Sequence, residues 1–359
     1  MELTTFANWS GLVESHDTET RAIASIDDAR LAIRDAIAEK RTVRTVGTTH
    51  SHSELLHAHG ALFLNTDELI GPITIDAGLG TARIPAGCKL HDVGDPLWQA
   101  GFSLSNQGDV DVQSIGGLIG TGVHGTGRAL RSISDAVVGA TLLTASGDVV
   151  TTDGDAELLE AIRLNLGCLG VILDVTLRVQ PSYYLHERTW HEPSDSVMER
   201  LDELVSATRH FEFFWRPETD LANAKALHPH EGPVDAMVGT DNEYVDRAYK
   251  VFPTPRNEKH TEMEYAVPES LGPACFAAIR KLLQAQFPDV TWPIEYRTLA
   301  ADDGWISPAR DRATVTISIH QGVTLPYKAF FDTAEHIFRE FGGRPHWGKV
   351  HSLGAKELS

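Results

Sequence analysis

Cysteine is scarce in this chain, and the few residues present are not arranged for cross-linking. The 359 residues include three cysteines, Cys88, Cys168 and Cys275, which are odd in number and far apart. No CxxC pair occurs, so neither a disulfide framework nor a cysteine-based metal site is expected. This cysteine usage fits a reducing compartment.

Long apolar segments are also missing. No run of about 18 apolar residues occurs, so the sequence predicts no transmembrane helix. The first five residues, MELTT, contain neither a basic stretch nor the start of an apolar one, so no signal peptide is expected. From these absences we expect a cytoplasmic location.

Positive charge is in deficit. The 31 Lys and Arg residues are outnumbered by 50 Asp and Glu residues, which gives a formal net charge of -19. Such a chain would be repelled by the phosphates of nucleic acids and by anionic membranes. The substrate is therefore expected to be neutral, or to be held by cations gathered inside a pocket.

The remaining composition is that of a globular protein, 42% hydrophobic and long enough for two domains. In the first half, many short strands are interleaved with helices, which is an α+β pattern rather than a regular βαβ series. Helices are expected at 26–37, 90–100 and 156–166, the first of them capped by Ser25. Strands are expected at 41–46, 62–64, 73–75, 82–84, 137–144, 149–150 and 171–179.

The composition changes after Pro181. Aromatic and charged residues gather at 210–216, and prolines become frequent. We therefore expect a first domain at 1–185 and a second at 186–343, followed by a segment, 344–359, that returns to a functional site. The chain stops soon afterwards without an obvious closing element.

The segment 46–53, VGTTHSHS, ends a predicted strand with small residues and then presents a histidine. Small side chains let backbone N–H groups approach a phosphate closely. The pattern suggests a phosphate-bearing cofactor held by the backbone, with the His50 imidazole beside its reactive ring. The alternative is a polar surface turn with incidental histidines.

A second glycine-rich segment, 114–127, has the sequence SIGGLIGTGVHGTG. Gly120, Gly122 and Gly125 formally match the dinucleotide fingerprint GxGxxG. However, no clear strand precedes them, residues 126–128 are a poor helix start, and no acidic residue follows at the expected distance, so a Rossmann fold is rejected. We expect instead a buried loop whose N–H groups wrap a pyrophosphate. The alternative is a flexible surface loop.

Histidines crowd the stretch 50–59, where they occupy positions 50, 52, 57 and 59. A zinc or copper site is conceivable there, but neither an HExxH motif nor Cys/His spacing supports it. No metal site is expected, and His52, His57 and His59 are treated as ordinary residues.

Two predicted strands of the second domain carry polar faces. Glu295 and Arg297 are two residues apart, so they share one side of a strand. Polar and apolar residues alternate in the same way over 315–320. A front of Glu, Arg, hydroxyls and imidazole suits a polyhydroxylated substrate, which needs donors and acceptors together. The alternative is a solvated outer face.

Three motifs of the first domain, GTTHS at 47–51, DVQSIGG at 111–117 and TGVHGTG at 121–127, resemble the PCMH-type flavin domain of the vanillyl-alcohol-oxidase superfamily. EMEYAVP at 262–268 and HWGK at 346–349 narrow the resemblance to aldonolactone and alditol oxidases of the D-arabinono-1,4-lactone oxidase type. The resemblance covers essentially the whole chain. It implies an α+β flavoenzyme with a PCMH-type FAD domain, a sheet-containing substrate domain, and FAD joined covalently to His50.

The resemblance also implies roles for individual residues. The positions that match the family's catalytic residues are Ser114, Glu295, Arg297, His320 and Lys349. The positions that match its FAD-binding residues are Val46, Gly47, Thr48, Thr49, His50, Ser51, Ser114, Gly117, Thr121, Gly122, His124, Gly125, Thr126, Ile172 and His346.

For the reaction, the resemblance implies hydride transfer from a CH–OH carbon of a sugar lactone to the flavin, with Arg297 or Lys349 stabilising the developing alkoxide. Dioxygen would then be reduced to hydrogen peroxide, because Gly108 falls near the position where related enzymes use a small residue to admit dioxygen. An alditol or xylitol oxidase and an L-gulonolactone dehydrogenase with another acceptor remain alternatives. The early end of the chain suggests a further one, a truncated flavin- or sugar-binding protein with impaired catalysis.

Overall fold

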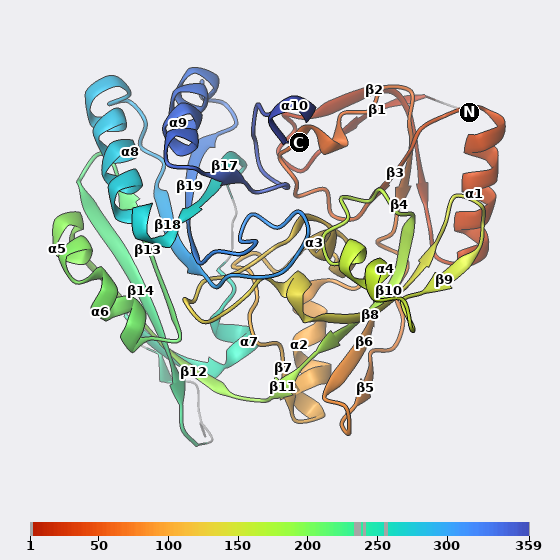
Figure 1. Ribbon diagram of the computed structural model, residues 1–359, viewed down its shortest axis with the longest axis horizontal. Coiled ribbons are helices and arrows are strands. Elements are labelled where there is room, and N and C mark those ends of the chain that lie inside the picture. Colours follow the sequence, from red (N-terminus) through yellow and green to blue (C-terminus); the bar gives the residue numbers. More distant parts are fainter. Residues whose placement is uncertain (1–2, 233–237, 240–241, 255–257, 359) are drawn as a thin grey trace.

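The computed structural model describes residues 3–232, 238–239, 242–254 and 258–358. The chain forms two parts that lie side by side, one built on three small sheets and the other on one large sheet (Figure 1). The strands of the small sheets come from residues 4–181, and those of the large sheet from residues 184–345. Among the described residues, no helix is both long and apolar enough to cross a membrane.

The first small sheet has the strand order β1-β2-β4-β3 and mixes parallel with antiparallel pairs. Helix α1 packs against it through Ala29, Ala32 and Ile33. The Ser25 side chain accepts a hydrogen bond from the Asp28 N–H, 3.2 Å away, so the predicted helix cap is confirmed. The elements are β1 (Thr4–Ala7), β2 (Glu14–Ala22), α1 (Ile26–Ala38), β3 (Val43–Val46), η1 (Glu54–Leu56) and β4 (Leu62–Asn65).

The second small sheet is antiparallel, in the order β5-β6-β10-β8-β9. Its central strand β10 buries every second residue from Val171, as the alternation in the sequence predicted. The predicted hairpin around residue 147 is also confirmed, because β8 pairs with β9. The elements are β5 (Thr74–Asp76), β6 (Thr81–Pro85), α2 (Leu90–Gln99), β8 (Val137–Leu143), β9 (Val149–Thr151) and β10 (Val171–Arg178), with β7 (Phe102–Ser103) and β11 (Gln180–Pro181) as a separate pair.

Two local predictions were wrong. The segment 114–127 was expected to be a loop, but Ile115–Thr121 forms helix α3, which ends at Gly122 with φ of 76°. A Cβ on Gly116 would lie 3.0 Å from the Ala86 Cβ, so glycine lets this helix pack closely against its neighbour. Helix α4 (Ala156–Ile162) ends four residues before the predicted boundary, because the Asn165 side chain donates to the Ile162 carbonyl. A short helix, η2 (Ile133–Ala136), lies between them.

The large sheet is antiparallel throughout, in the order β15-β16-β12-β14-β13-β18-β19-β17-β20. Helices α5, α6, α8 and α9 cover its outer side (Figure 1). The strands are β12 (Tyr184–Pro193), β13 (His210–Arg216), β14 (Leu221–His230), β15 (Val238–Gly239), β16 (Glu243–Arg247), β17 (His260–Pro268), β18 (Ile294–Leu299), β19 (Thr314–Gly322) and β20 (Arg344–Pro345). The helices are α5 (Ser194–Glu199), α6 (Leu201–Ala207), α7 (Ala248–Val251), η3 (Glu269–Leu271), α8 (Gly272–Gln286), α9 (Lys328–Glu340) and α10 (Ala355–Leu358).

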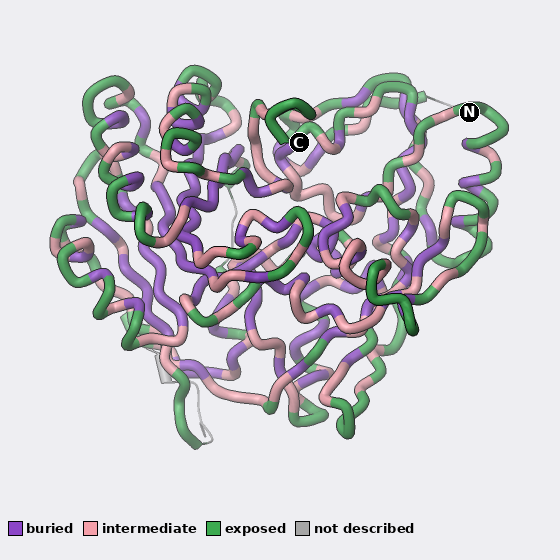
Figure 2. The backbone as a smooth tube through the Cα atoms, viewed as in Figure 1, coloured by how far each residue is buried: buried purple, intermediate pink, exposed green. Residues whose placement is uncertain are grey.

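Both faces of the large sheet are buried at its centre, where every residue of β18 and β19 is buried (Figure 2). The apolar face, which includes Phe213, Tyr296 and Ile317, packs with α8 and α9. The polar face is turned toward the first part of the chain, and Glu295 and Arg297 are only 4% and 7% exposed. The alternative of a solvated outer face is therefore wrong.

Candidate functional site

A large cavity lies where the two parts of the chain meet. Its empty space amounts to about 1590 Å³ when the part open to solvent is counted. One side of the cavity is lined by segments that contain many small residues, at 44–51, 108–124 and 165–172. On the other side lie polar side chains of β17, β18 and β19 and the segment 346–349. The cavity thus joins a wall of small residues to a wall of charged ones.

The two glycine-rich segments meet in this cavity. A Cβ on Gly47 would lie 1.8 Å from the Ser114 Oγ and 2.8 Å from its Cβ, so only glycine fits against the start of α3. Thr49 adopts φ of 58°, and its carbonyl accepts from the Trp9 N–H at 3.0 Å. The polar-surface-turn and surface-loop alternatives are therefore wrong for these segments, which line an interior wall.

We expect Gly47→Ala to destabilise the fold by about 1–3 kcal/mol, because the added methyl group overpacks the contact with Ser114. Thermal unfolding of the purified variant measures this. Gly71→Ala is the matched control, since its Cβ would meet nothing nearer than the Pro85 Cγ at 3.6 Å. Equal melting temperatures for both variants would contradict the close approach.

His50 presents a neutral ring to the cavity. Burial is the main cause that lowers the pKa of His50 to about 4, and the nearby positive charge of Lys349 contributes to the same shift. The ring stacks on Trp9 with centroids 4.8 Å apart. At neutral pH one nitrogen of the imidazole therefore carries a free lone pair. The stacking contact with Trp9 holds the ring in place.

Most of the residues predicted from the sequence line this cavity. All five catalytic candidates do, and so do the FAD-binding candidates Val46, Gly47, Thr48, Thr49, His50, Ser51, Ser114, Gly117, Thr121, His124, Ile172 and His346. Gly122 lies off the cavity as the C-cap of α3. Gly125 and Thr126 do not line the main cavity either, and both line a smaller one. The Thr126 hydroxyl donates to the carbonyl of Phe211 on the large sheet at 2.6 Å.

Glu264, a residue that the sequence analysis assigned no role, is the centre of one ionic cluster. Its carboxylate lies 2.8 Å from the His124 Nε2, accepts from the Ser318 hydroxyl at 2.7 Å, and pairs with Arg297. Burial would raise the pKa of Glu264, but Arg297 and His124 outweigh it and hold the pKa well below its usual range. Glu264 therefore joins the glycine-rich wall to the sheet.

Two cations that line the cavity, Arg297 and Lys349, pair with further carboxylates of the sheet. The Arg297 guanidinium lies 3.3 Å from the Glu295 carboxylate, and Lys349 pairs with Glu262. Burial alone would lower the pKa of Arg297, but Glu295, Glu264 and Glu262 outweigh it and raise the pKa. Among the described residues, Glu295 Oε1 and Arg297 Nε have no hydrogen-bond partner. These buried atoms are available to a ligand, since buried polar groups are normally paired.

Behind Arg297, a buried lysine supports the sheet. The Lys225 amino group lies 3.4–3.6 Å from carboxylates of Glu187, Glu212 and Asp109. Glu212 is the register partner of Arg297 across β13 and β18. Burial raises the pKa of Glu212 to about 7, although Lys225 opposes the shift. This group was not predicted, because its members come from four separate segments.

His260, Glu262 and Glu264 were missed as site residues although a signal was present. They alternate with Thr261, Met263 and other residues along β17, in the same way as Glu295 and Arg297 do on β18. The same spacing of two residues therefore predicted that their side chains share one side of a strand. Their partners His124 and Lys349 lie more than 80 residues away, so the pairing itself was not visible in the sequence.

Comparisons with known proteins identify the family of this chain. Residues 175–238 and 234–359 match the family model described as D-arabinono-1,4-lactone oxidase, and residues 20–153 match the one described as FAD binding domain. The L-gulono-1,4-lactone dehydrogenase of Mycobacterium tuberculosis (strain ATCC 25618 / H37Rv) is 34% identical, over 98% of this chain and 91% of that protein. The L-gulonolactone oxidase of Bos taurus is 27% identical, over 93% and 86%.

Among solved structures, a solvent-stable cholesterol oxidase superposes with a TM-score of 0.84, over 98% of this chain and 87% of that one. The two sequences are 18% identical, so this likeness shows that the fold is shared and nothing more. The small residues of the glycine-rich wall suit FAD, because they let phosphates approach the backbone closely. The chain belongs to the D-arabinono-1,4-lactone oxidase family, FAD-dependent oxidoreductases that act on CH–OH groups.

Proposed function

We propose that this protein oxidises a CH–OH group of a sugar lactone, with FAD attached to His50 and dioxygen as electron acceptor. Residues 1–185 would bind the flavin, residues 186–343 would hold the substrate, and residues 344–359 would bring Lys349 to the site. The observation that carries the proposal is the meeting of His50 and the Gly47–Ser114 contact with Glu295, Arg297 and Lys349 around one cavity.

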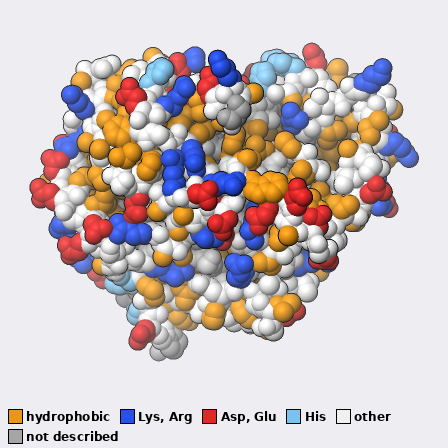
Figure 3. All heavy atoms as spheres, viewed as in Figure 1, with side chains coloured by type: hydrophobic (Ala, Val, Ile, Leu, Met, Phe, Trp, Pro, Cys, Tyr) orange, Lys and Arg blue, Asp and Glu red, His pale blue; other side chains and the backbone are white. Residues whose placement is uncertain are grey.

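FAD, when bound, supplies the hydride acceptor. The chain's own residues would hold it: the turn at 47–51 and Gly117 of α3 line the cavity, and their small residues let phosphates approach the backbone. A nitrogen of the neutral His50 imidazole would hold the flavin covalently. On the face shown in Figure 3, acidic and basic side chains are interspersed, whereas Glu295, Arg297 and Lys349 line the cavity.

The substrate is proposed to bind against Glu295, Arg297 and Lys349. A lactone carries several hydroxyls and a carbonyl, so it needs both acceptors and donors. Glu295 Oε1 offers an acceptor, and Arg297 Nε offers a donor. The reacting hydroxyl would give its proton to the Glu295 carboxylate, whose Oε1 is unpaired, while the hydride passes to the flavin. Arg297 and Lys349 would stabilise the negative oxygen that develops, and Glu264 and Glu262 hold these two cations in place.

A screen for hydrogen peroxide release tests the substrate and acceptor together. The purified protein is incubated with aldonolactones and alditols in air, and in parallel without oxygen but with an artificial electron acceptor. We expect peroxide with at least one aldonolactone and less turnover with alditols. Turnover with the artificial acceptor alone would support a dehydrogenase, the activity named for the M. tuberculosis relative.

We expect Gly108→Ala to slow reoxidation of the reduced flavin by dioxygen by about tenfold or more, a barrier increase of about 1.4 kcal/mol. Gly108 lines the cavity, and a Cβ there would lie 3.1 Å from the Val123 Cγ1, which leaves less room for a small gas molecule. Stopped-flow mixing of substrate-reduced protein with oxygenated buffer measures the rate. Flavin reduction by substrate is the internal control, and an unchanged reoxidation rate would argue against this path.

A further inference from the structure

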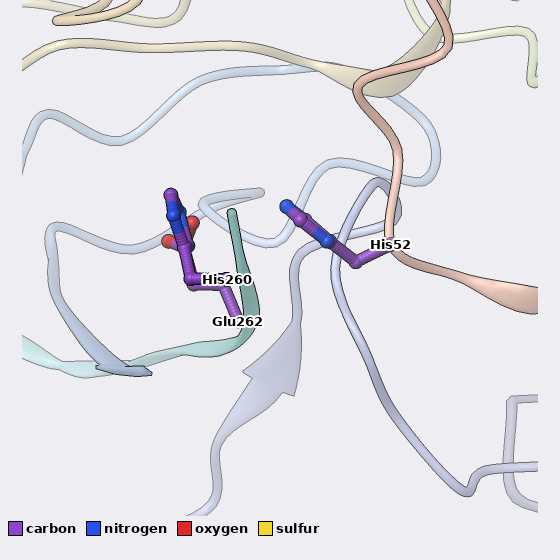
Figure 4. Close-up of side chains that lie close together, drawn as sticks. All are labelled: His52, His260 and Glu262. Carbon is purple, nitrogen blue, oxygen red and sulfur yellow. The ribbon is translucent and has the colours of Figure 1, made fainter. Parts of the chain in front are cut away.

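Three side chains converge at the edge of the cavity, and two of them, His52 and His260, have no part in the proposed oxidation. His52 comes from the segment after β3, and His260 and Glu262 come from β17, more than 200 residues later. Figure 4 shows the His52 ring directed toward the other two side chains. One potential ligand atom from each residue lies within 4.8 Å of the other two. His52 does not line the main cavity, so the three groups enclose a point at its margin.

The His52 ring is buried without a satisfied set of hydrogen bonds. The residue is only 5% exposed, and its Nδ1 has no partner among the described residues. Its backbone N–H donates to the Gly348 carbonyl at 2.7 Å, which fixes the main chain at this position. A buried, unpaired imidazole nitrogen in a polar cluster calls for a ligand, because buried polar atoms are normally paired.

His260 is oriented as metal-binding histidines usually are. Its Nδ1 lies 2.9 Å from the Glu258 carbonyl, which only accepts, so Nδ1 carries the hydrogen and the neutral ring keeps a lone pair on Nε2. Trp9 packs edge-on against both rings, with centroid distances of 6.3 Å to His52 and 5.4 Å to His260. The two imidazoles are therefore held by neighbours rather than free to rotate.

We propose that His52, His260 and Glu262 form a binding site for a divalent cation of the zinc class, which competes with Lys349 for the Glu262 carboxylate. Two imidazoles and one carboxylate, with a further position left open, are a ligand set that zinc accepts. Magnesium and calcium prefer oxygen ligands throughout, so they are expected to bind poorly. Because Lys349 pairs with Glu262, the bound cation and the ammonium group oppose each other.

Equilibrium dialysis of the flavin-loaded full chain, first stripped with a chelator, tests the site. We expect one zinc per chain and no comparable uptake of magnesium. His52→Gln and His260→Gln should each weaken zinc binding at least about 100-fold, since loss of outer-shell partners alone costs about 10–100-fold. His57→Gln is the control, because His57 is exposed and outside the cluster. Two ligand variants are used so that one remains if the other does not fold.

Lys349→Met provides a second, opposite readout, a tightening of zinc binding by about tenfold when the competing charge is removed. Zinc binding that survives both His52→Gln and His260→Gln, or that is lost in His57→Gln, would place the metal elsewhere and overturn the proposal. Absence of zinc uptake by the wild-type chain would do the same. These measurements concern binding alone, so their failure is distinguishable from failure of the proposed lactone oxidation.

Discussion

Replacing His50 with alanine is expected to abolish covalent flavin attachment. After acid precipitation, the wild-type pellet should be yellow and its gel band fluorescent, whereas the His50→Ala pellet should be colourless. The physical reason is that His50 presents a neutral ring nitrogen to the cavity, with a pKa lowered to about 4 by burial and by Lys349. His57→Ala is the matched control, since His57 is exposed and lies outside the cavity.

The same pKa predicts the pH dependence of attachment. The reactive form is the neutral ring, and a lowered pKa keeps the ring neutral down to about pH 4. Incorporation of FAD into apoprotein is therefore expected to be independent of pH between about 8 and 5, and to fall only as the pH approaches 4. A decline centred near the usual histidine value of about 6.5 would show that His50 is not desolvated in this way.

His50→Ala should also slow the reaction if it still binds FAD without the covalent bond. Covalent attachment is expected to raise the flavin potential. For a two-electron couple, a change in potential of about 30 mV corresponds to a free energy of about 1.4 kcal/mol. If all of this free energy is added to the activation barrier, the rate falls about tenfold. Measuring the potential and the rate of anaerobic flavin reduction on the same preparation tests that link. A yellow acid pellet from His50→Ala would refute the tether outright.

The largest effect on chemistry is expected from Arg297→Met. This change removes a buried cation that is placed to stabilise a negative oxygen, and loss of one such donor costs about 100- to 1000-fold in kcat. The rate of anaerobic flavin reduction by substrate, measured only on the flavin-loaded fraction, reports this step. Arg297→Lys should fall between the wild type and Arg297→Met, because it keeps the charge but loses the guanidinium geometry.

Arg297→Met also leaves Glu264 and Glu295 without their cation, so a stability loss of about 3–5 kcal/mol is expected beside the kinetic one. Arg280→Met separates the two effects. Arg280 pairs with Asp195 and Asp220 on the outer side of the large sheet and does not line the cavity. It should lower stability but leave flavin reduction nearly unchanged. A reduction rate for Arg297→Met within about threefold of wild type would exclude its proposed role.

Local patterns in the sequence were reliable where neighbouring residues determine the structure. Alternation along 171–179 predicted the central strand of the second sheet, and Ser25 followed by Asp28 predicted a helix start. The shared side of Glu295 and Arg297 was predicted by their spacing of two and confirmed by their common cavity. Boundaries were less secure. Helix α4 ends earlier than predicted, where the Asn165 side chain donates to the Ile162 carbonyl. Helix α3 forms where a loop was expected, and its Gly116 packs closely against Ala86.

What the sequence by itself determined was the kind of wall that each segment supplies: small residues in the first part of the chain, and alternating polar faces in the second. What only the tertiary structure decided was which of these walls meet. Gly47 contacts Ser114, Lys349 reaches Glu262, and His52 faces His260, each across a long stretch of chain. Such pairings depend on how the large sheet packs against the first part of the molecule. No local spacing encodes that packing, so ionic partners and the proposed cation site appear only in three dimensions.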